Sequence, residues 1–292
     1  MFTIPPKVAA IHDLSCFGRC ALTVIIPTLS AMGIQTVPVP TALLSTHTGG
    51  FTDMLFVDLS GEMDGISDHF RSLGLKFDSV YSGFLGSEAQ IERVASFIDE
   101  FAENGAPVLV DPVMGDDGAL YSTYTKEMGE GMRHLVRKAD IITPNYTEAC
   151  FLTDTPYVSL DGMDEGEVEG LAEELIEKLS RMGAKKIAVT GFEACGSVLT
   201  FGTEGNGIFT NRKARLSASY PGTGDIFAST LLGRALAGDR FQAAVNKACD
   251  FTAAVIDYTM KFPTPHREGV MLEPCLKLLF DYATAKGDSD RV

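Results

Sequence analysis

The sequence predicts an α/β fold in three layers, α/β/α, with a mostly parallel central sheet and helices on both faces. Short apolar runs of strand length alternate along the chain with longer segments whose apolar residues recur at helical spacing. Hydrophobic residues make up 45% of the 292 residues, which is enough for a sizeable core. Since no linker, internal repeat or low-complexity stretch divides the chain, we expect residues 1–292 to form a single domain.

The first half of the chain predicts a strand, a helix and a second strand, followed by further strands and helices. Val8 to Ile11 is apolar on both faces, as in a buried parallel strand. Pro27 would either kink the apolar helix expected over 20–32 or mark its true start. We expect strands over 7–12, 34–39, 77–82 and 107–110, loops over 13–18 and 40–50, and helices over 61–73 and 87–104, the last one capped by Ser87.

The second half continues the alternation and adds an antiparallel pair. The clearest amphipathic pattern covers 165–182, where apolar residues line one face and acidic residues fill the other. We expect strands over 140–142 and 186–190, an antiparallel pair over 195–201 and 207–210, helices over 125–138, 165–182, 223–237, 241–258 and 272–285, and a polar tail from residue 286.

The stretch Gly222-Thr223-Gly224-Asp225, which follows the last expected strand, gives the strongest indication of catalytic function in the sequence. The glycines free the backbone for a turn, and the spacing that follows predicts a helix beginning at Gly222 or Thr223. Unpaired amides at such a helix start favour an anion, so Asp225 in the first turn indicates a base beside a phosphate. The alternative is a helix start capped by Thr223 and charged by Asp225, with no chemistry.

Polar residues follow most of the predicted strands, and ligands of parallel sheets bind beyond the carboxyl ends of the strands. These positions are Asp13, 82–87, 111–118, 143–148 and Thr190-Gly191. Asp111, Asp116 and Glu148 could surround Mg²⁺, directly or through water, because Mg²⁺ favours a few carboxylates plus phosphate oxygens. These residues, and His47 in the expected loop over 40–50, also have structural interpretations. The Asp residues could be turn acids, Asn145 and Glu148 could form a reciprocal helix cap, and His47 could be a satisfied loop histidine.

Composition excludes several classes of function. Asp and Glu number 39 against 24 Lys and Arg, a net charge of −15, which argues against binding nucleic acid or an anionic membrane. No apolar run has the length of a membrane span, and the N-terminal residues lack a signal pattern. The six scattered cysteines indicate free thiols in a reducing cytoplasm. A Walker motif and the protein-kinase signature set are both missing from the sequence.

The polar motifs together resemble a known family. Gly222-Thr223-Gly224-Asp225 looks like the anion hole and catalytic Asp of the ribokinase-like kinases. Four other stretches, in the family order, resemble the pyridoxal (pyridoxine, pyridoxamine) kinases. They are Ser45-Thr46-His47-Thr48-Gly49, Ser82-Gly83-Phe84-Leu85-Gly86-Ser87, Asp111-Pro112-Val113-Met114-Gly115-Asp116 and Ile141-Ile142-Thr143-Pro144-Asn145-x-x-Glu148.

The resemblance implies ATP-dependent phosphorylation of the 5′-hydroxymethyl group of a B6 vitamer. Asp225 would take the alcohol proton, and the amides of Gly222, Thr223 and Gly224 would hold the transferring phosphoryl group. The implied ATP-binding residues are Asp111, Thr143, Asn145, Glu148, Thr190, Gly222 and Thr223, and the implied Mg²⁺ residues are Asp116 and Glu148. The implied substrate residues are Asp13, His47, Thr48, Phe84, Tyr121 and Asp225. A homodimer and a K⁺ requirement are also implied.

Two positions depart from the pyridoxal kinase pattern, since many relatives carry Ser in place of Asp13 and Tyr in place of Phe84. Asp13 is also what the related hydroxymethylpyrimidine kinases carry, although the run 14–18 here is not the glycine-rich run that follows it there. The alternatives are therefore a hydroxymethylpyrimidine kinase of thiamine synthesis and a non-catalytic paralogue that binds a vitamer. Retention of Asp225 argues against the paralogue, because storage needs no base.

Overall fold

The computed structural model describes residues 4–121, 124–205 and 207–284. Within them, one sheet holds nine strands in the order β11-β10-β9-β8-β5-β4-β1-β2-β3, and β6 and β7 pair as a separate hairpin. The strands are β1 (Lys7–Phe17), β2 (Gln35–Thr46), β3 (Phe56–Asp58), β4 (Ser79–Ser82), β5 (Val108–Val110), β6 (Gly115–Asp116), β7 (Ala119–Leu120), β8 (Ile141–Ile142), β9 (Lys186–Ala194), β10 (Ser197–Thr203) and β11 (Ile208–Ala214). The middle of the sheet, from β9 to β2, is parallel.

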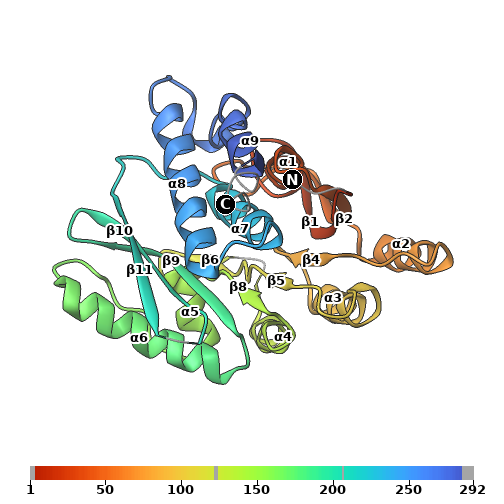
Figure 1. The fold of residues 1–292 in the computed structure, drawn as a ribbon, viewed down its shortest axis with the longest axis horizontal. Helices are drawn as coiled ribbons and strands as arrows, with labels where there is room; N and C mark the ends of the chain where they lie inside the picture. Colours follow the sequence, from red (N-terminus) through yellow and green to blue (C-terminus); the bar gives the residue numbers. More distant parts are fainter. Residues whose placement is uncertain (1–3, 122–123, 206, 285–292) are drawn as a thin grey trace, which may run out of the picture.

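Helices cover both faces of this sheet, so the predicted three-layer α/β/α fold is confirmed (Figure 1). The helices are α1 (Leu22–Ala31), α2 (Ser60–Ser72), α3 (Glu88–Phe101), α4 (Lys126–Val136), α5 (Tyr146–Leu152), α6 (Glu165–Arg181), α7 (Thr223–Leu236), α8 (Phe241–Thr259) and α9 (Lys277–Thr284). Neighbouring residues of β1 point to opposite faces. Val8 packs with α1, α7, α8 and α9, whereas Ala9 packs with α2 to α6.

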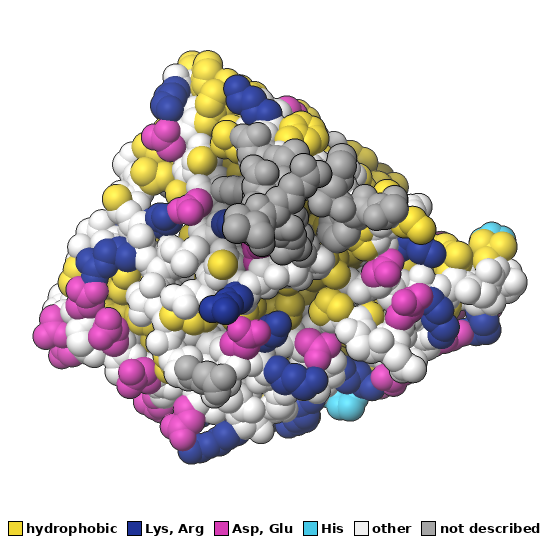
Figure 2. All heavy atoms as spheres, in the orientation of Figure 1, with side chains coloured by type: hydrophobic (Ala, Val, Ile, Leu, Met, Phe, Trp, Pro, Cys, Tyr) yellow, Lys and Arg dark blue, Asp and Glu magenta, His cyan; other side chains and the backbone are white. Residues whose placement is uncertain are grey.

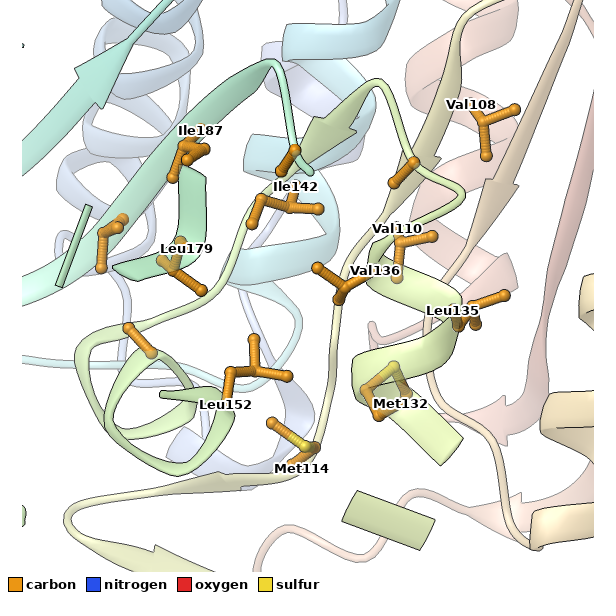
Figure 3. Packing of buried hydrophobic residues seen from close by; sticks show 14 of the residues in the cluster. Val108, Val110, Met114, Met132, Leu135, Val136, Ile142, Leu152, Leu179 and Ile187 are labelled. Carbon is orange, nitrogen blue, oxygen red and sulfur yellow. The ribbon is translucent and has the colours of Figure 1, made fainter. Parts of the chain in front are cut away.

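The larger core lies between the sheet and α2 to α6 (Figure 3). Val108, Val110, Ile142 and Ile187 project from the parallel strands toward apolar side chains of α4, α5 and α6. These strands are apolar on both faces because helices cover both. Since the strands run parallel, their carboxyl ends lie at the same edge of the sheet.

Two loops expected near the N-terminus are largely strand. β1 continues through residues 13–17 and β2 through 40–46, and the two strands pair as far as Phe17 and Thr46 with a register shift between His12 and Leu14. The short strand β3 then pairs with the end of β2. The hydroxyl and imidazole side chains in these stretches suggest a loop, but the backbone hydrogen bonds come from distant strands.

Other boundaries differ for local reasons. Pro27 lies inside α1 rather than at its start. The strand expected to stop at residue 190 continues to Ala194 as β9, because β10 folds back along it. The β6–β7 hairpin was not among the expected elements, and α5 was expected only in the alternative that reads Asn145 and Glu148 as a helix cap. Glu273–Cys275 is a separate 3₁₀ turn containing Pro274, so the last helix starts only at Lys277, and its expected end at 285 lies outside the described residues.

Acidic and basic side chains lie interspersed over the face shown in Figure 2. Many form surface ion pairs, including Arg93 with Asp64 and Lys138 with Asp99. Across the described ranges, none of the helices combines the length and apolar character that crossing a bilayer requires.

Candidate active site

The start of α7 has the geometry of an anion site. Gly222 precedes the helix with φ of 81°, and a Cβ at this position would lie 2.2 Å from the carbonyl oxygen of Arg19, so only glycine fits. The Thr223 hydroxyl donates to the Tyr220 carbonyl at 3.0 Å, and no side chain caps the helix. The structure therefore does not have the Thr223 cap of the alternative interpretation, and the first amides of α7 lack an intrahelical acceptor.

Asp225 lies in this first turn with its side chain 12% exposed. The amide of Ala21 donates to its Oδ2 at 2.8 Å, and the Cys20 thiol lies 3.6 Å from the same oxygen. Burial raises the pKa of Asp225 above its ordinary value, and these two hydrogen bonds oppose that shift. A carboxylate with a raised pKa is a stronger proton acceptor than an exposed Asp.

A cleft of about 1060 Å³ opens between the start of α7 and the ends of β5, β8 and β9. It brings together most of the residues that the sequence singled out, from separate parts of the chain. These are Asp111, Asp116, Tyr121, Thr143, Asn145, Glu148, Thr190, Gly222, Thr223, Gly224 and Asp225, which we call the phosphate half of the site. The predicted gathering of strand-end residues at one edge is therefore present.

Asp111 is buried at the end of β5 and accepts a hydrogen bond from the Thr143 hydroxyl at 3.0 Å. Burial, reinforced by the charge of Asp225, raises the pKa of Asp111 to about 8. A buried carboxylate close to another negative charge favours a ligand that brings positive charge.

Glu148 belongs to a capping box at the start of α5. Its two carboxylate oxygens accept the amides of Met114 at 3.0 Å and Asn145 at 2.8 Å, while the Asn145 side chain accepts the Glu148 amide. The reciprocal-cap interpretation of this pair is thus confirmed. Burial, followed by the charge of Asp111, raises the pKa of Glu148 well above its usual value.

Asp116 is exposed on β6, and its Oδ1 accepts the amide of Asp117 at 3.0 Å. Over the parts of the chain that the structure describes, no three His, Cys, Asp or Glu side chains are close enough to hold a metal by themselves. The donors that line the cleft fit a Mg²⁺ ion whose remaining ligands are phosphate oxygens and water, which is how Mg²⁺ is ordinarily held.

The other predicted substrate residues, Asp13, His47, Thr48 and Phe84, form a second group outside the lining of this cleft, which we call the ring half. Asp13 is buried on β1 and accepts the Ser15 hydroxyl at 2.9 Å. Burial, with the charge of Asp225, raises the pKa of Asp13 to about 6, so the two halves are electrostatically linked. Thr48 is exposed and Phe84 is half-buried.

His47 is already satisfied within the protein. Its Nε2 donates to the Arg267 carbonyl at 2.8 Å, and its Nδ1 accepts the Gly49 amide at 3.0 Å. The satisfied-histidine interpretation is confirmed, because a ring hydroxyl could bond His47 only by displacing one of these partners. The loop nevertheless lies close to the glycine turn, since a Cβ on Gly49 would lie 3.5 Å from Pro221.

Comparison with known proteins agrees with this geometry. A family model described as Phosphomethylpyrimidine kinase matches residues 10–269. The chain belongs to this family. It is 38% identical to a protein of Bacteroides thetaiotaomicron, assigned provisionally as a phosphomethylpyrimidine kinase and crystallised with pyridoxal. The match covers 94% of this chain and 96% of that one, with a TM-score of 0.87.

Curated relatives divide between two substrates. The chain is 25% identical over 274 residues to the pyridoxal kinase PdxY of Deinococcus radiodurans, which covers 90% of each protein. It is 24% identical over 268 residues to the hydroxymethylpyrimidine/phosphomethylpyrimidine kinase of Bacillus subtilis, covering 90% of this chain and 87% of the other. The resemblance inferred from the motifs is confirmed, and the protein is a kinase of the pyridoxal and hydroxymethylpyrimidine kinase family.

Sequence reasoning missed three residues that surround Asp225 in this kinase. Cys20 and Ala21 hydrogen-bond its carboxylate, and the buried His12 places Nδ1 4.0 Å from Oδ1. They lie more than 200 positions from Asp225, and no motif in the sequence links position 225 to 12 or 20. The polar run that follows the first strand was the available signal, and it favoured Asp13 instead.

Proposed function

We propose that this kinase transfers the γ-phosphoryl group of ATP to the 5′-hydroxymethyl group of a B6 vitamer: pyridoxal, pyridoxine or pyridoxamine. The observation that carries the proposal is the start of α7, where a buried carboxylate stands beside amides that no side chain caps. An alcohol and a phosphate can meet there with a base already in place.

In the proposed reaction, Asp225 accepts the proton of the vitamer hydroxyl while the oxygen of that hydroxyl bonds to the γ-phosphorus of ATP. The bond from that phosphorus to the bridging oxygen of ADP breaks, which gives ADP and the vitamer 5′-phosphate. The amides of Gly222, Thr223, Gly224 and Asp225 stabilise the charge on the transferring group. The raised pKa of Asp225 supports its role as the base.

The nucleotide would lie in the phosphate half of the site. Thr143 and Asn145 follow β8, Thr190 lies within β9, and all three line the cleft, where they would offer polar groups to the nucleotide. Asp111 would lie near the phosphates, where a bound cation would offset the free-energy cost of burying its carboxylate. Asp116 and Glu148 would hold Mg²⁺, which would supply positive charge to the phosphates. Tyr121 on the same wall would lie near substrate and phosphates. We also propose that the kinase requires K⁺, forms a homodimer and is cytoplasmic.

Pyridoxal in the crystal of the Bacteroides relative supports a vitamer as the substrate. Phe84 offers an aromatic face, and exposed Thr48 could offer its hydroxyl to a ring hydroxyl that hydroxymethylpyrimidine lacks. The alternative substrate, hydroxymethylpyrimidine, is favoured by Asp13, which could pair with an exocyclic amine, and by the Bacillus subtilis relative. A site built around a hydroxyl rejects an analogue that leaves its polar groups unpaired.

The test is ATP consumption by the purified protein against pyridoxal, pyridoxine, pyridoxamine and hydroxymethylpyrimidine, with phosphorylated product confirmed by mass spectrometry. We expect the best vitamer to have a higher kcat/KM than hydroxymethylpyrimidine. A higher kcat/KM for the pyrimidine would reverse the assignment, and absence of turnover with all four would remove the proposed activity.

A further inference from the structure

The segment that precedes α1 is locked against the start of α7. The Arg19 carbonyl oxygen would lie 2.2 Å from a Cβ on Gly222 and 2.8 Å from a Cβ on Gly269. Because these two glycines have no side chain, the backbone segments at Arg19, Gly222 and Gly269 can pack together. The Arg19 amide donates to the Glu268 carbonyl at 3.1 Å, and its guanidinium donates to Glu273 at 2.8 Å. The backbone at Arg19 is therefore fixed from both sides.

This fixed segment aims two donors at one oxygen of the base. Ala21 has φ of 50°, a conformation that non-glycine residues rarely adopt, and its amide donates to Asp225 Oδ2 at 2.8 Å. The Cys20 thiol, which lines the cleft, lies 3.6 Å from the same Oδ2. Strained backbone beside a catalytic carboxylate is a common sign that orientation matters there.

The other oxygen of Asp225 has a different neighbour. His12 is fully buried, its Nδ1 lies 4.0 Å from Oδ1, and neither ring nitrogen has a hydrogen-bond partner in the described residues. Burial lowers the pKa of His12 to about 3, so the ring is neutral and one nitrogen is an open acceptor. A proton that arrives on Oδ1 would thus find a polar neighbour. The charge of Asp225 also raises the pKa values of Asp13, Asp111 and Tyr81.

We propose that Cys20 is a positioning residue for the catalytic base: its thiol, with the Ala21 amide, holds Asp225 Oδ2 and leaves Oδ1 to take the substrate proton. The inference rests on the proposed function, since it requires Asp225 to be the base. It extends that function by giving the two carboxylate oxygens different tasks.

A thiol suits this task because it is a weak donor. Each hydrogen bond to a carboxylate stabilises the charged form and lowers its pKa, which makes it a poorer base. The thiol of Cys20 stays protonated, because burial and the charges of Asp225 and Asp13 raise its pKa well above its usual value. It can therefore fix the orientation of Asp225 while lowering its basicity less than a hydroxyl would.

Kinetics of Cys20→Ala and Cys20→Ser test the proposal, with Cys195→Ser as the control, a thiol exposed in the β9–β10 turn. For Cys20→Ala we expect kcat to fall about 10-fold, because a misplaced base reacts slowly, with the KM for ATP unchanged. The acid limb of its kcat–pH profile should move to higher pH, since one donor to Asp225 is lost. Cys20→Ser should restore most of kcat and move the limb to or below its wild-type position.

Alkylation of Cys20 by iodoacetamide, followed by peptide mass spectrometry, gives a readout that does not depend on activity. In Asp225→Asn the neighbouring charge is gone, so the pH midpoint for alkylation of Cys20 should move to lower values. This measurement also decides the matter if Cys20→Ala fails to fold. If the pH midpoint for alkylation is the same in the wild type and in Asp225→Asn, or if both proteins react equally slowly, the contact between Cys20 and Asp225 is contradicted.

The outcomes separate the two proposals. If Asp225→Asn keeps wild-type kcat, the proposed base is wrong, whatever Cys20 does. If Asp225→Asn is inactive while Cys20→Ala has wild-type kcat and an unmoved acid limb, the base stands and the positioning role fails. A Cys20→Ser variant that is as slow as Cys20→Ala, with the same pH profile, also overturns the positioning role.

Discussion

The phosphate half and the ring half of the site are built in different ways. The phosphate half consists of residues that follow β5, β7 and β8, lie on β6, β9 and α5, or begin α7, and it lines one cleft. Residues in and beside the ring half depend on contacts between distant segments, such as His47 with Arg267 and His12 beneath Gly83. The residues proposed for phosphoryl transfer therefore lie mostly at the ends of strands and helices, whereas those proposed for substrate choice depend on tertiary packing.

Asp225→Asn should have the largest effect, and this effect should fall on the phosphoryl-transfer step. We expect kcat to fall about 10²- to 10⁴-fold, because an amide cannot accept the alcohol proton, while ATP affinity stays near wild type. The wild-type kcat should itself fall as pH drops through the raised pKa of Asp225, where the carboxyl becomes protonated. Steady-state kinetics and nucleotide titration measure both quantities.

The matched control is Asp257→Asn, an exposed α8 carboxylate paired with Lys261. It should leave kcat unchanged. An Asp225→Asn variant with more than about a third of wild-type kcat would remove Asp225 from the role of base, since general-base catalysis contributes at least about 10²-fold.

Gly83→Ala should disturb the packing around His12 and leave nucleotide binding unchanged. A Cβ on Gly83 would lie 2.1 Å from Cε1 of the buried His12, so the imidazole must move in the space beside Asp13 and Asp225. We expect kcat/KM for the vitamer to fall about 10²-fold, because small displacements near reacting groups are costly. The KM for ATP should change little.

Gly86→Ala is the control in the same loop, since the atom nearest its added Cβ is 3.7 Å away. It should behave like the wild type. If Gly83→Ala also keeps wild-type kcat/KM for the vitamer, the packing of His12 under Gly83 does not control the ring half. If it loses ATP affinity to the same extent, the two halves are not separable.

Sequence alone predicted the layers, the helix start at Gly222 and the strand-end residues, because these follow from local patterns. It predicted loops where β1 and β2 continue, since hydroxyl and imidazole side chains there suggest turns while the backbone partners are distant in sequence. It also gave His47 a place beside the substrate ring, although neighbouring segments occupy both of its nitrogens. Residues whose role depends on such distant contacts, Cys20 above all, carried no readable signal.

Glu148→Gln and Asp116→Asn would sharpen the comparison inside the phosphate half. Glu148 accepts two amides, and Gln has only one acceptor oxygen, so we expect a loss of about 1–3 kcal/mol of stability and a lower Tm. Exposed Asp116 should change stability by less than about 0.5 kcal/mol. Both variants should need more Mg²⁺ for half-maximal rate, because carboxylate charge sets metal affinity.

Mg²⁺ titrations of rate, beside thermal melts of the same samples, separate these effects. If Asp116→Asn has the wild-type titration and excess Mg²⁺ rescues nothing, Asp116 is a turn acid. If Glu148→Gln loses only stability, Glu148 serves the helix cap and has no part in holding Mg²⁺.

Thr48→Val should give the smallest effect and addresses substrate choice directly. The two candidate substrates share a hydroxymethyl group on a nitrogen heteroaromatic ring, so the phosphate half cannot distinguish them. With both nitrogens of His47 engaged, discrimination through a ring hydroxyl falls to exposed Thr48. One hydrogen bond is worth about 0.5–1.5 kcal/mol, so the ratio of kcat/KM for vitamer over pyrimidine should fall about 2- to 13-fold. Thr210→Val, an exposed β11 position outside the cleft lining, should leave the ratio unchanged. A vitamer preference that survives Thr48→Val intact would move the source of specificity to Asp13 and Phe84.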